Sequence, residues 1–124
     1  MAARIRLLEY IREDGSNPFK SWFDGLDPQA AAKVATAALR LKMGNTSNIK
    51  WFEGIGEARI DWGPGYRIYL AKDGETLIVL LGGGTKRGQR ADIQRARELH
   101  AEYKARKPAR GKTPDVTTPG TRRQ

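Results

Sequence analysis

The sequence predicts one α+β domain, in which the helices are separated from a mostly antiparallel sheet. The chain contains two helix-start signals, because Asn-Pro at 17–18 and Asp-Pro at 27–28 each place a capping side chain before a proline. It also contains two turn signals, Gly-Pro-Gly at 63–65 and Asp-Gly at 73–74, which separate short runs of strand-forming residues. The expected order of elements is β-α-α-β-β-β-β-α.

The first half of the chain accounts for one strand and both of these helices. Residues 3–12 alternate imperfectly between apolar and polar side chains and predict a strand that ends in a turn at 13–16. The second helix should end at Gly44, a residue suited to the left-handed conformation of a helix stop. The short connection between the helices predicts an antiparallel hairpin. A further short strand is expected at 49–53.

One face of the first helix collects aromatic residues. Phe19, Trp22, Phe23 and Leu26 recur at helical spacing and form an apolar face. Packing in the core accounts for this face. A role for Trp22 in stacking on a nucleotide base is the alternative.

Register in the central hairpins follows from the two turns. If the loop at 63–65 has three residues, Asp61 lies opposite Arg67. A two-residue turn at 73–74 then places Arg67 opposite Leu80. Both predictions depend on the loop lengths, because each added loop residue shifts every cross-strand pair.

The apolar run at 77–81 has no polar face, so this strand should be covered on both sides. The three glycines at 82–84 predict the point where the chain leaves the sheet. Two basic residues follow directly. The four charged residues expected to converge at this end of the sheet are Asp61, Arg67, Lys86 and Arg87.

The last third of the chain predicts one helix and a tail. Apolar residues recur at helical spacing over 90–104 and would form the inner face of the helix. This face consists of Ile93, Ala96, Leu99 and Tyr103. The domain is therefore expected to span 1–104. Residues 105–124 are rich in Pro, Gly, Thr and basic charge and predict a disordered tail.

Composition narrows the class of protein. A chain of 124 residues has the length of one domain, and its net charge of +9 indicates a polyanionic partner. With no cysteine and one histidine, a disulfide framework and a thiolate metal site are excluded. The longest apolar run is too short to span a bilayer, and the first residues lack the apolar region of a signal peptide. We expect a cytoplasmic protein without metal, cofactor or membrane contact.

The basic residues at the end of the sheet suggest phosphate recognition and, if the polyanion is RNA, cleavage without a metal. Arg and Lys stabilise the negative charge that develops when a 2′-hydroxyl attacks the adjacent phosphate. A lysine crowded by other cations, or the carboxylate of Asp61, could transfer the proton. A structural interpretation stands beside this one: Asp61 and Arg67 form a cross-strand ion pair, and Lys86 and Arg87 are solvated loop charges.

Three separated segments resemble one family of small proteins. ARIDWGPGYRIYL and IVLLGGGTKRGQRADIQRA, preceded by NPFKSWFDGLD, are similar to the addiction module killer proteins, a HigB-like branch of the RelE/ParE superfamily. The resemblance covers about residues 4–104. It implies a bacterial type II toxin with a sheet, an N-terminal helical hairpin and a C-terminal helix. Many such toxins cut mRNA in the ribosomal A site, and in this branch a helix-turn-helix DNA-binding antitoxin usually neutralises them.

The resemblance also implies site residues. Arg67 matches the Arg of the strand after the turn, and Lys86 and Arg87 match the basic residues after the apolar strand. Arg59 lies near a Lys of the better-studied RNases. The Tyr that those RNases carry near the last helix falls near Ile93 here, which leaves the proton-transfer group open.

Two other functions stay open at this point. A ParE-like toxin shares the fold and inhibits DNA gyrase by binding, without nuclease residues. A non-catalytic nucleic-acid-binding domain would need the basic charge alone. The cluster of Arg67, Lys86 and Arg87 favours an endoribonuclease over both.

Overall fold

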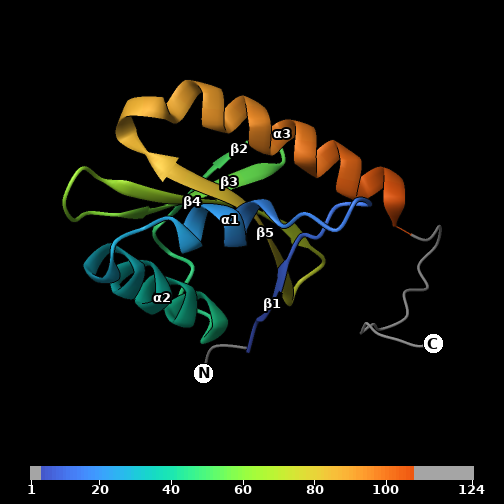
Figure 1. Cartoon of the computed structure of the whole chain (residues 1–124). Coiled ribbons are helices and arrows are strands. Elements are labelled where there is room, and N and C mark those ends of the chain that lie inside the picture. Colours follow the sequence, from blue (N-terminus) through green and yellow to red (C-terminus); the bar gives the residue numbers. More distant parts are fainter. Residues whose placement is uncertain (1–3, 108–124) are drawn as a thin grey trace.

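The structure, a computed structural model, describes residues 4–107 and shows an α+β domain with a five-stranded mixed sheet and three helices (Figure 1). The strands lie in the order β1-β5-β4-β3-β2, and the expected order of elements along the chain is confirmed. Among the strands of residues 4–107, only the pairing of β1 with β5 is parallel. The elements are β1 (Arg6–Glu9), α1 (Pro18–Asp24), α2 (Pro28–Lys42), β2 (Ile49–Phe52), β3 (Ile55–Ile60), β4 (Tyr66–Asp73), β5 (Leu77–Thr85), the 3₁₀ turn η1 (Lys86–Gly88) and α3 (Gln89–Arg106).

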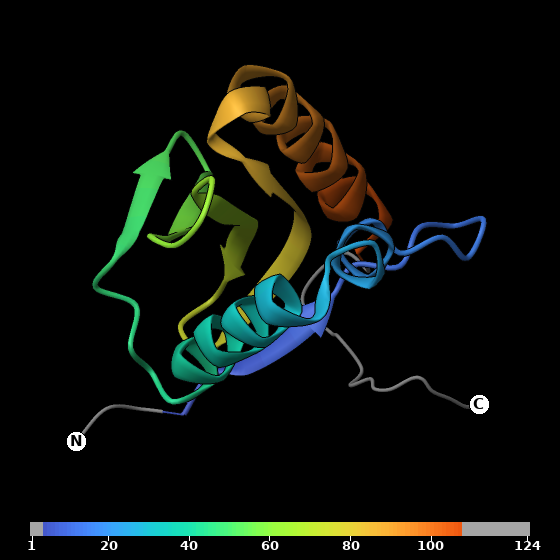
Figure 2. The ribbon, with the colours of Figure 1, turned by 60° about the vertical axis from the view of Figure 1, so that its left-hand side comes forward.

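Helices cover both faces of the sheet. α1 and α2 lie on one face and α3 crosses the other (Figure 2). Ile78 and Leu80 of β5 belong to the cluster under α1 and α2, whereas Val79 and Leu81 belong to the cluster under α3. The expectation that the 77–81 strand is covered on both sides is therefore confirmed.

Both helix starts form as their sequences predict. The Asn17 side chain accepts a hydrogen bond from the Lys20 amide at 3.0 Å, and the Asp27 side chain accepts one from the Ala30 amide at 2.9 Å. These bonds satisfy amides that the first helical turn leaves without partners. Gly44 follows α2 with a φ of 91°, which a residue with a Cβ adopts only at a cost.

The first hairpin differs from the sequence-based register by two residues. Arg59, not Asp61, lies opposite Arg67, because the loop between β3 and β4 has five residues, 61–65. The loop closes on itself, since the Trp62 amide bonds the Ile60 carbonyl and the Gly65 amide bonds the Trp62 carbonyl, both at 3.0 Å. A slip of two residues keeps every side chain on its expected face.

The second hairpin also differs. Its loop contains three residues, 74–76, and a bulge between Tyr69 and Leu70 shifts the register once more. Arg67 therefore pairs with Gly84 and not with Leu80. The prediction that the chain leaves the sheet at 82–84 is wrong, because β5 continues to Thr85.

Packing explains why glycines occupy the end of β5. A Cβ at Gly83 would overlap the ring of Trp22 from α1, and a Cβ at Gly84 would overlap the carboxylate of Asp92 from α3. The two helices thus approach this strand from opposite faces closely enough to require glycine.

The first strand and the last helix depart from their expected boundaries by a few residues. The first strand, expected at 3–12, pairs with β5 only over Arg6–Glu9, and α3 extends past the predicted end at 104 to Arg106. The rest of the predicted tail, 108–124, lies outside the described residues. None of the helices in residues 4–107 combines the length and the apolar character that a membrane span requires.

An ion pair ties the segment after β1 to α3. Glu102 accepts hydrogen bonds from Arg12, two at 3.0 Å, and from the Tyr10 hydroxyl at 2.6 Å. These bonds, led by those from Arg12, lower the pKa of Glu102 to about 2 from an ordinary 4.5. The contribution of Glu102 to stability is therefore present above pH 4.5 and is lost as the pH falls toward 2.

We expect Glu102→Gln to lower the melting temperature at neutral pH and to lose that effect in acid. Thermal unfolding of both proteins between neutral pH and strong acid measures the difference. Glu98→Gln is the matched control, because Glu98 is exposed on the same helix and its carboxylate accepts a hydrogen bond from the neutral Gln94. A melting-temperature difference for Glu102→Gln that stays constant down to pH 2 would contradict the assigned role of the pair.

Candidate functional site

A buried carboxylate organises the end of the sheet where the basic residues gather. Glu57 of β3 is fully buried, and a buried charge is tolerated only with polar partners. Its two oxygens accept four hydrogen bonds. The donors are Arg59 Nε at 3.1 Å, Arg67 Nε at 3.2 Å, the Tyr69 hydroxyl at 3.2 Å and Gln89 Nε2 at 2.7 Å.

The register explains why this carboxylate is needed. Arg59 and Arg67 lie directly opposite each other on neighbouring strands, an arrangement that destabilises a sheet when the charges are alike. Glu57 bonds one arginine with each oxygen, so its single negative charge bridges the two arginines and offsets one of their two positive charges. The bridging of two like charges by one carboxylate therefore accounts for the network without any ligand.

The Arg67 guanidinium is held by hydrogen bonds to Glu57 and to the loop before β4. Arg67 is 6% exposed, and its Nη1 donates to the Gly65 carbonyl at 3.1 Å. The backbone amide of Lys86 donates to the same carbonyl at 3.0 Å. The structure thus brings Arg67 and Lys86 together around Gly65, even though the two strands pair in a different register from the expected one.

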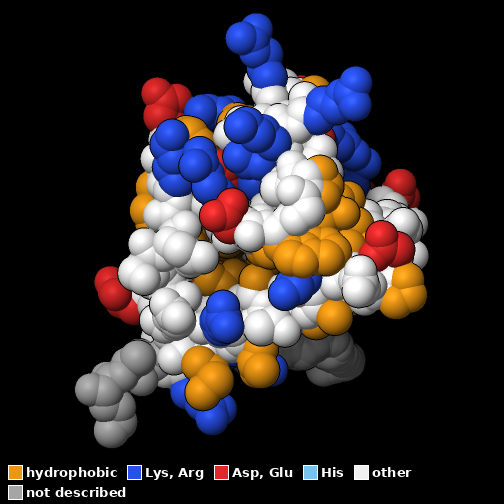
Figure 3. Space-filling model, turned by 90° about the vertical axis from the view of Figure 1, so that its left-hand side faces the viewer, with side chains coloured by type: hydrophobic (Ala, Val, Ile, Leu, Met, Phe, Trp, Pro, Cys, Tyr) orange, Lys and Arg blue, Asp and Glu red, His pale blue; other side chains and the backbone are white. Residues whose placement is uncertain are grey.

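The other basic candidates face solvent. We define the cationic rim as Arg59, Lys86 and Arg87: the Arg59 side chain is 48% exposed, and Lys86 and Arg87 are exposed on η1. Figure 3 looks onto one end of the molecule, where Lys and Arg side chains gather beside a hydrophobic patch. The rim is rigidly mounted, because its residues belong to β3 and η1.

Asp61 does not take the predicted position. It lies in the 61–65 loop, is exposed, and forms no ion pair among the described residues. The carboxylate that meets Arg67 is Glu57 instead. The sequence gives only a weak signal for this role of Glu57. Glu57 and Arg59 are two residues apart and therefore share a strand face, but this spacing points to Arg67 only once the register is known.

Tyr69 and Asp92 are two further titratable groups that the sequence did not single out. Burial, together with the charge of Glu57, raises the pKa of Tyr69 above its ordinary value, so its hydroxyl remains a hydrogen-bond donor. The Asp92 carboxylate lies over Gly84 of β5, which pairs with Arg67 of β4. Burial raises the pKa of Asp92, so its carboxyl keeps its proton to a higher pH than an exposed Asp does.

The arrangement can bind phosphates and stabilise negative charge. Arg and Lys held on rigid elements supply that stabilisation without reorganising during a reaction. Among residues 4–107, no group of three or more His, Cys, Asp or Glu side chains is placed to hold a metal ion.

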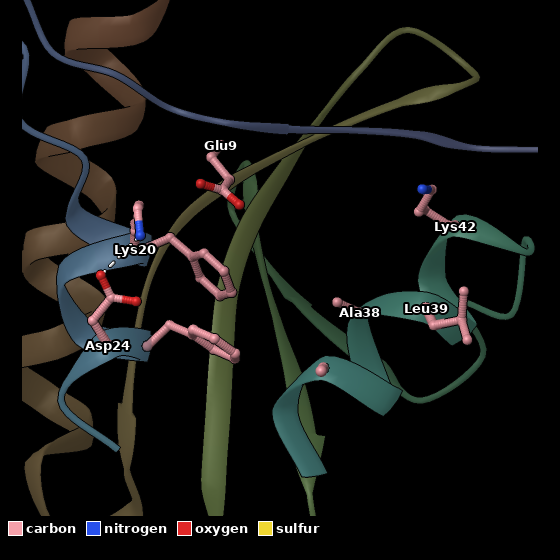
Figure 4. A pocket seen from close by; sticks show the side chains of 9 residues that line it. Glu9, Lys20, Asp24, Ala38, Leu39 and Lys42 are labelled. Atoms are coloured by element: carbon pink, nitrogen blue, oxygen red, sulfur yellow. Dashed lines mark hydrogen bonds and ion pairs between the residues drawn. The ribbon is translucent and has the colours of Figure 1, made fainter. Parts of the chain in front are cut away.

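A separate hollow of about 440 Å³ lies between α1 and α2. Glu9 and the ion pair of Lys20 with Asp24 lie on one side of it, and Leu39 and Lys42 lie on the other (Figure 4). None of the predicted site residues lines this hollow.

Two comparisons with known proteins bear on the chain. No family model matches it. An uncharacterized protein of Haemophilus influenzae is 43% identical over 86 residues, which cover 68% of this chain and 87% of that protein.

Proposed function

We propose that this chain, which belongs to the same family as the Haemophilus influenzae protein, is the toxin component of a type II toxin–antitoxin module. The proposed activity is ribosome-dependent cleavage of mRNA, which arrests growth. The observation that carries the proposal is the gathering of Arg59, Arg67, Lys86 and Arg87 at one end of the sheet. A RelE/ParE-like fold is part of the same proposal and is consistent with the order of elements.

In the proposed reaction the 2′-hydroxyl of one nucleotide gives up its proton to a solvent water and attacks its own 3′-phosphate. The bond from phosphorus to the 5′-oxygen of the next nucleotide breaks, which leaves a cyclic phosphate and a free 5′-hydroxyl. The cationic rim binds the phosphate and stabilises its added charge. Arg67 acts from beneath the rim as a fixed positive charge, and Asp92 is our candidate to donate the proton that the leaving oxygen needs.

Partners follow from this activity. The substrate is mRNA on the ribosome, which implies a cytoplasmic location. A helix-turn-helix DNA-binding antitoxin is proposed as the neutralising partner. The net charge of +9 supports a polyanionic target such as mRNA.

Growth of cells that express the chain tests the proposal. We expect induction of the wild-type protein to arrest growth and Lys86→Ala with Arg87→Ala to relieve the arrest, because two exposed phosphate-binding charges are lost while the buried network stays intact. Arg40→Ala with Lys42→Ala is the matched control, since both residues are exposed on α2 and lie away from the rim. Equal arrest by both double variants would refute the role of the rim.

Binding without cleavage is the second candidate function. The observation that favours it is the burial of Arg67 and its ion pair with Glu57, which leave this arginine little freedom to contact a substrate. A toxin that inhibits DNA gyrase, or a non-catalytic nucleic-acid-binding domain, would need only the exposed charges. Growth arrest with intact mRNA and an induced DNA-damage response would favour the gyrase inhibitor.

A further inference from the structure

Three aromatic side chains lie at the same end of the sheet as the cationic rim. Trp62 of the 61–65 loop stacks on Tyr66, with ring centroids 6.1 Å apart and planes at 22°. Tyr66 also meets Trp22 of α1 at 6.5 Å. All three side chains are partly exposed.

Core packing does not account for Trp62 and Tyr66. Among the described residues, both hydrophobic clusters are built without them, whereas Trp22 packs against the cluster under α1 and α2. Trp22 therefore anchors Tyr66 to the core, and Trp62 extends the stack outward. The loop that carries Trp62 is held by its two internal hydrogen bonds and by a positive φ of 58° at Gly63.

Positive charge lies beside this pair of rings. The ammonium of Lys33 lies 5.6 Å from the centre of the Trp62 ring, and Lys33 is exposed. Lys86 is bonded through its amide to Gly65 in the same loop. Tyr66 and Arg67 are consecutive in β4, so the rings and the buried arginine lie on opposite faces of one strand end.

We propose that Trp62 and Tyr66 form a stacking platform for an unpaired base of single-stranded RNA, with Lys33 and Lys86 contacting the flanking phosphates. Aromatic rings beside Lys and Arg side chains are the combination that binds single strands with little sequence preference. A duplex keeps its bases stacked on each other and cannot use the platform. The inference rests on the proposed function for the identity of the RNA as substrate, but it concerns binding and does not require cleavage.

Fluorescence anisotropy of a labelled oligoadenylate of roughly ten nucleotides, titrated with the purified full chain, tests the platform. We expect Trp62→Ala to raise Kd about tenfold or more and Trp62→Phe to retain most of the affinity. Trp51→Ala is the matched control, because Trp51 is 46% exposed but lies on the edge strand β2, paired with Gly56. The salt dependence separates the roles: Trp62→Ala should leave its slope unchanged, whereas Lys33→Ala should lower it by about 1.

Thermal unfolding of each variant shows whether the fold is kept, and the Phe variant tests the ring contact if the Ala variant does not fold. Unchanged affinity of Trp62→Ala, or an equal loss toward single-stranded and duplex RNA, would overturn the platform. Specific loss toward the single strand supports it even if transcripts in cells stay intact, in which case the cleavage proposal alone fails. Cleavage by a Trp62→Ala protein with unchanged RNA affinity would refute the platform and leave the cleavage proposal standing.

Discussion

Replacing Glu57 with Ala is expected to lower the free energy of unfolding by about 3–5 kcal/mol. Arg67 is only 6% exposed, and the change removes the carboxylate that it pairs with. Arg67 then lies directly opposite the like charge of Arg59. Tyr69 and Gln89 lose their acceptor at the same time. Urea denaturation followed by fluorescence measures the loss, since the chain contains 3 Trp residues.

Two controls separate this network from an ordinary surface ion pair. Glu53→Ala removes a carboxylate whose side chain is 83% exposed and which pairs with Arg97, so we expect a change of roughly 0–1 kcal/mol. Glu57→Leu combined with Arg67→Leu removes both buried charges together and should be less destabilised than Glu57→Ala. A loss below about 1 kcal/mol for Glu57→Ala would show that the carboxylate does not hold the arginines together.

Gly83→Ala is expected to destabilise the protein by about 1–3 kcal/mol, the usual cost of overpacking, and we expect a value near the upper end of that range. The added methyl group would overlap the Trp22 ring, which α1 holds against the strand and which packs on Phe19 and Tyr66. Neither the ring nor the central sheet can shift without breaking these contacts. The same change should disturb the stacking platform, because Trp22 anchors it.

Gly82→Ala provides the matched control within the same glycine triplet. A Cβ at Gly82 would meet nothing within 4 Å, so we expect a change of at most about 0.5 kcal/mol. Thermal or urea unfolding of the two variants makes the comparison. Equal stability of the Gly82 and Gly83 variants would contradict the close approach of Trp22 to β5.

Signals that act over a few residues predicted the elements well. Asn17, Asp27 and Gly44 mark helix ends through bonds and backbone angles that involve only their neighbours. The two-sided apolar run of β5 predicted an interior strand, because only such a strand is covered on both faces. These features required no knowledge of distant contacts.

Register could not be predicted in the same way. The loop at 61–65 has five residues because Trp62 and Gly65 bond within it, and the bulge beside Leu70 has no clear local signal. The sequence placed Arg67 and Lys86 together, since both flank the same strand ends. It missed Glu57 as the carboxylate between the arginines, because that role depends on which residue faces which across two strands.

The most direct test of the proposed function is sequencing of transcript 5′ ends after a short induction of the chain in cells. Cleavage by attack of a 2′-hydroxyl predicts new 5′-hydroxyl ends within coding regions, present with the wild-type protein and lost with the Lys86→Ala, Arg87→Ala variant. The Arg40→Ala, Lys42→Ala control should retain them. Intact transcripts during full growth arrest would contradict mRNA cleavage.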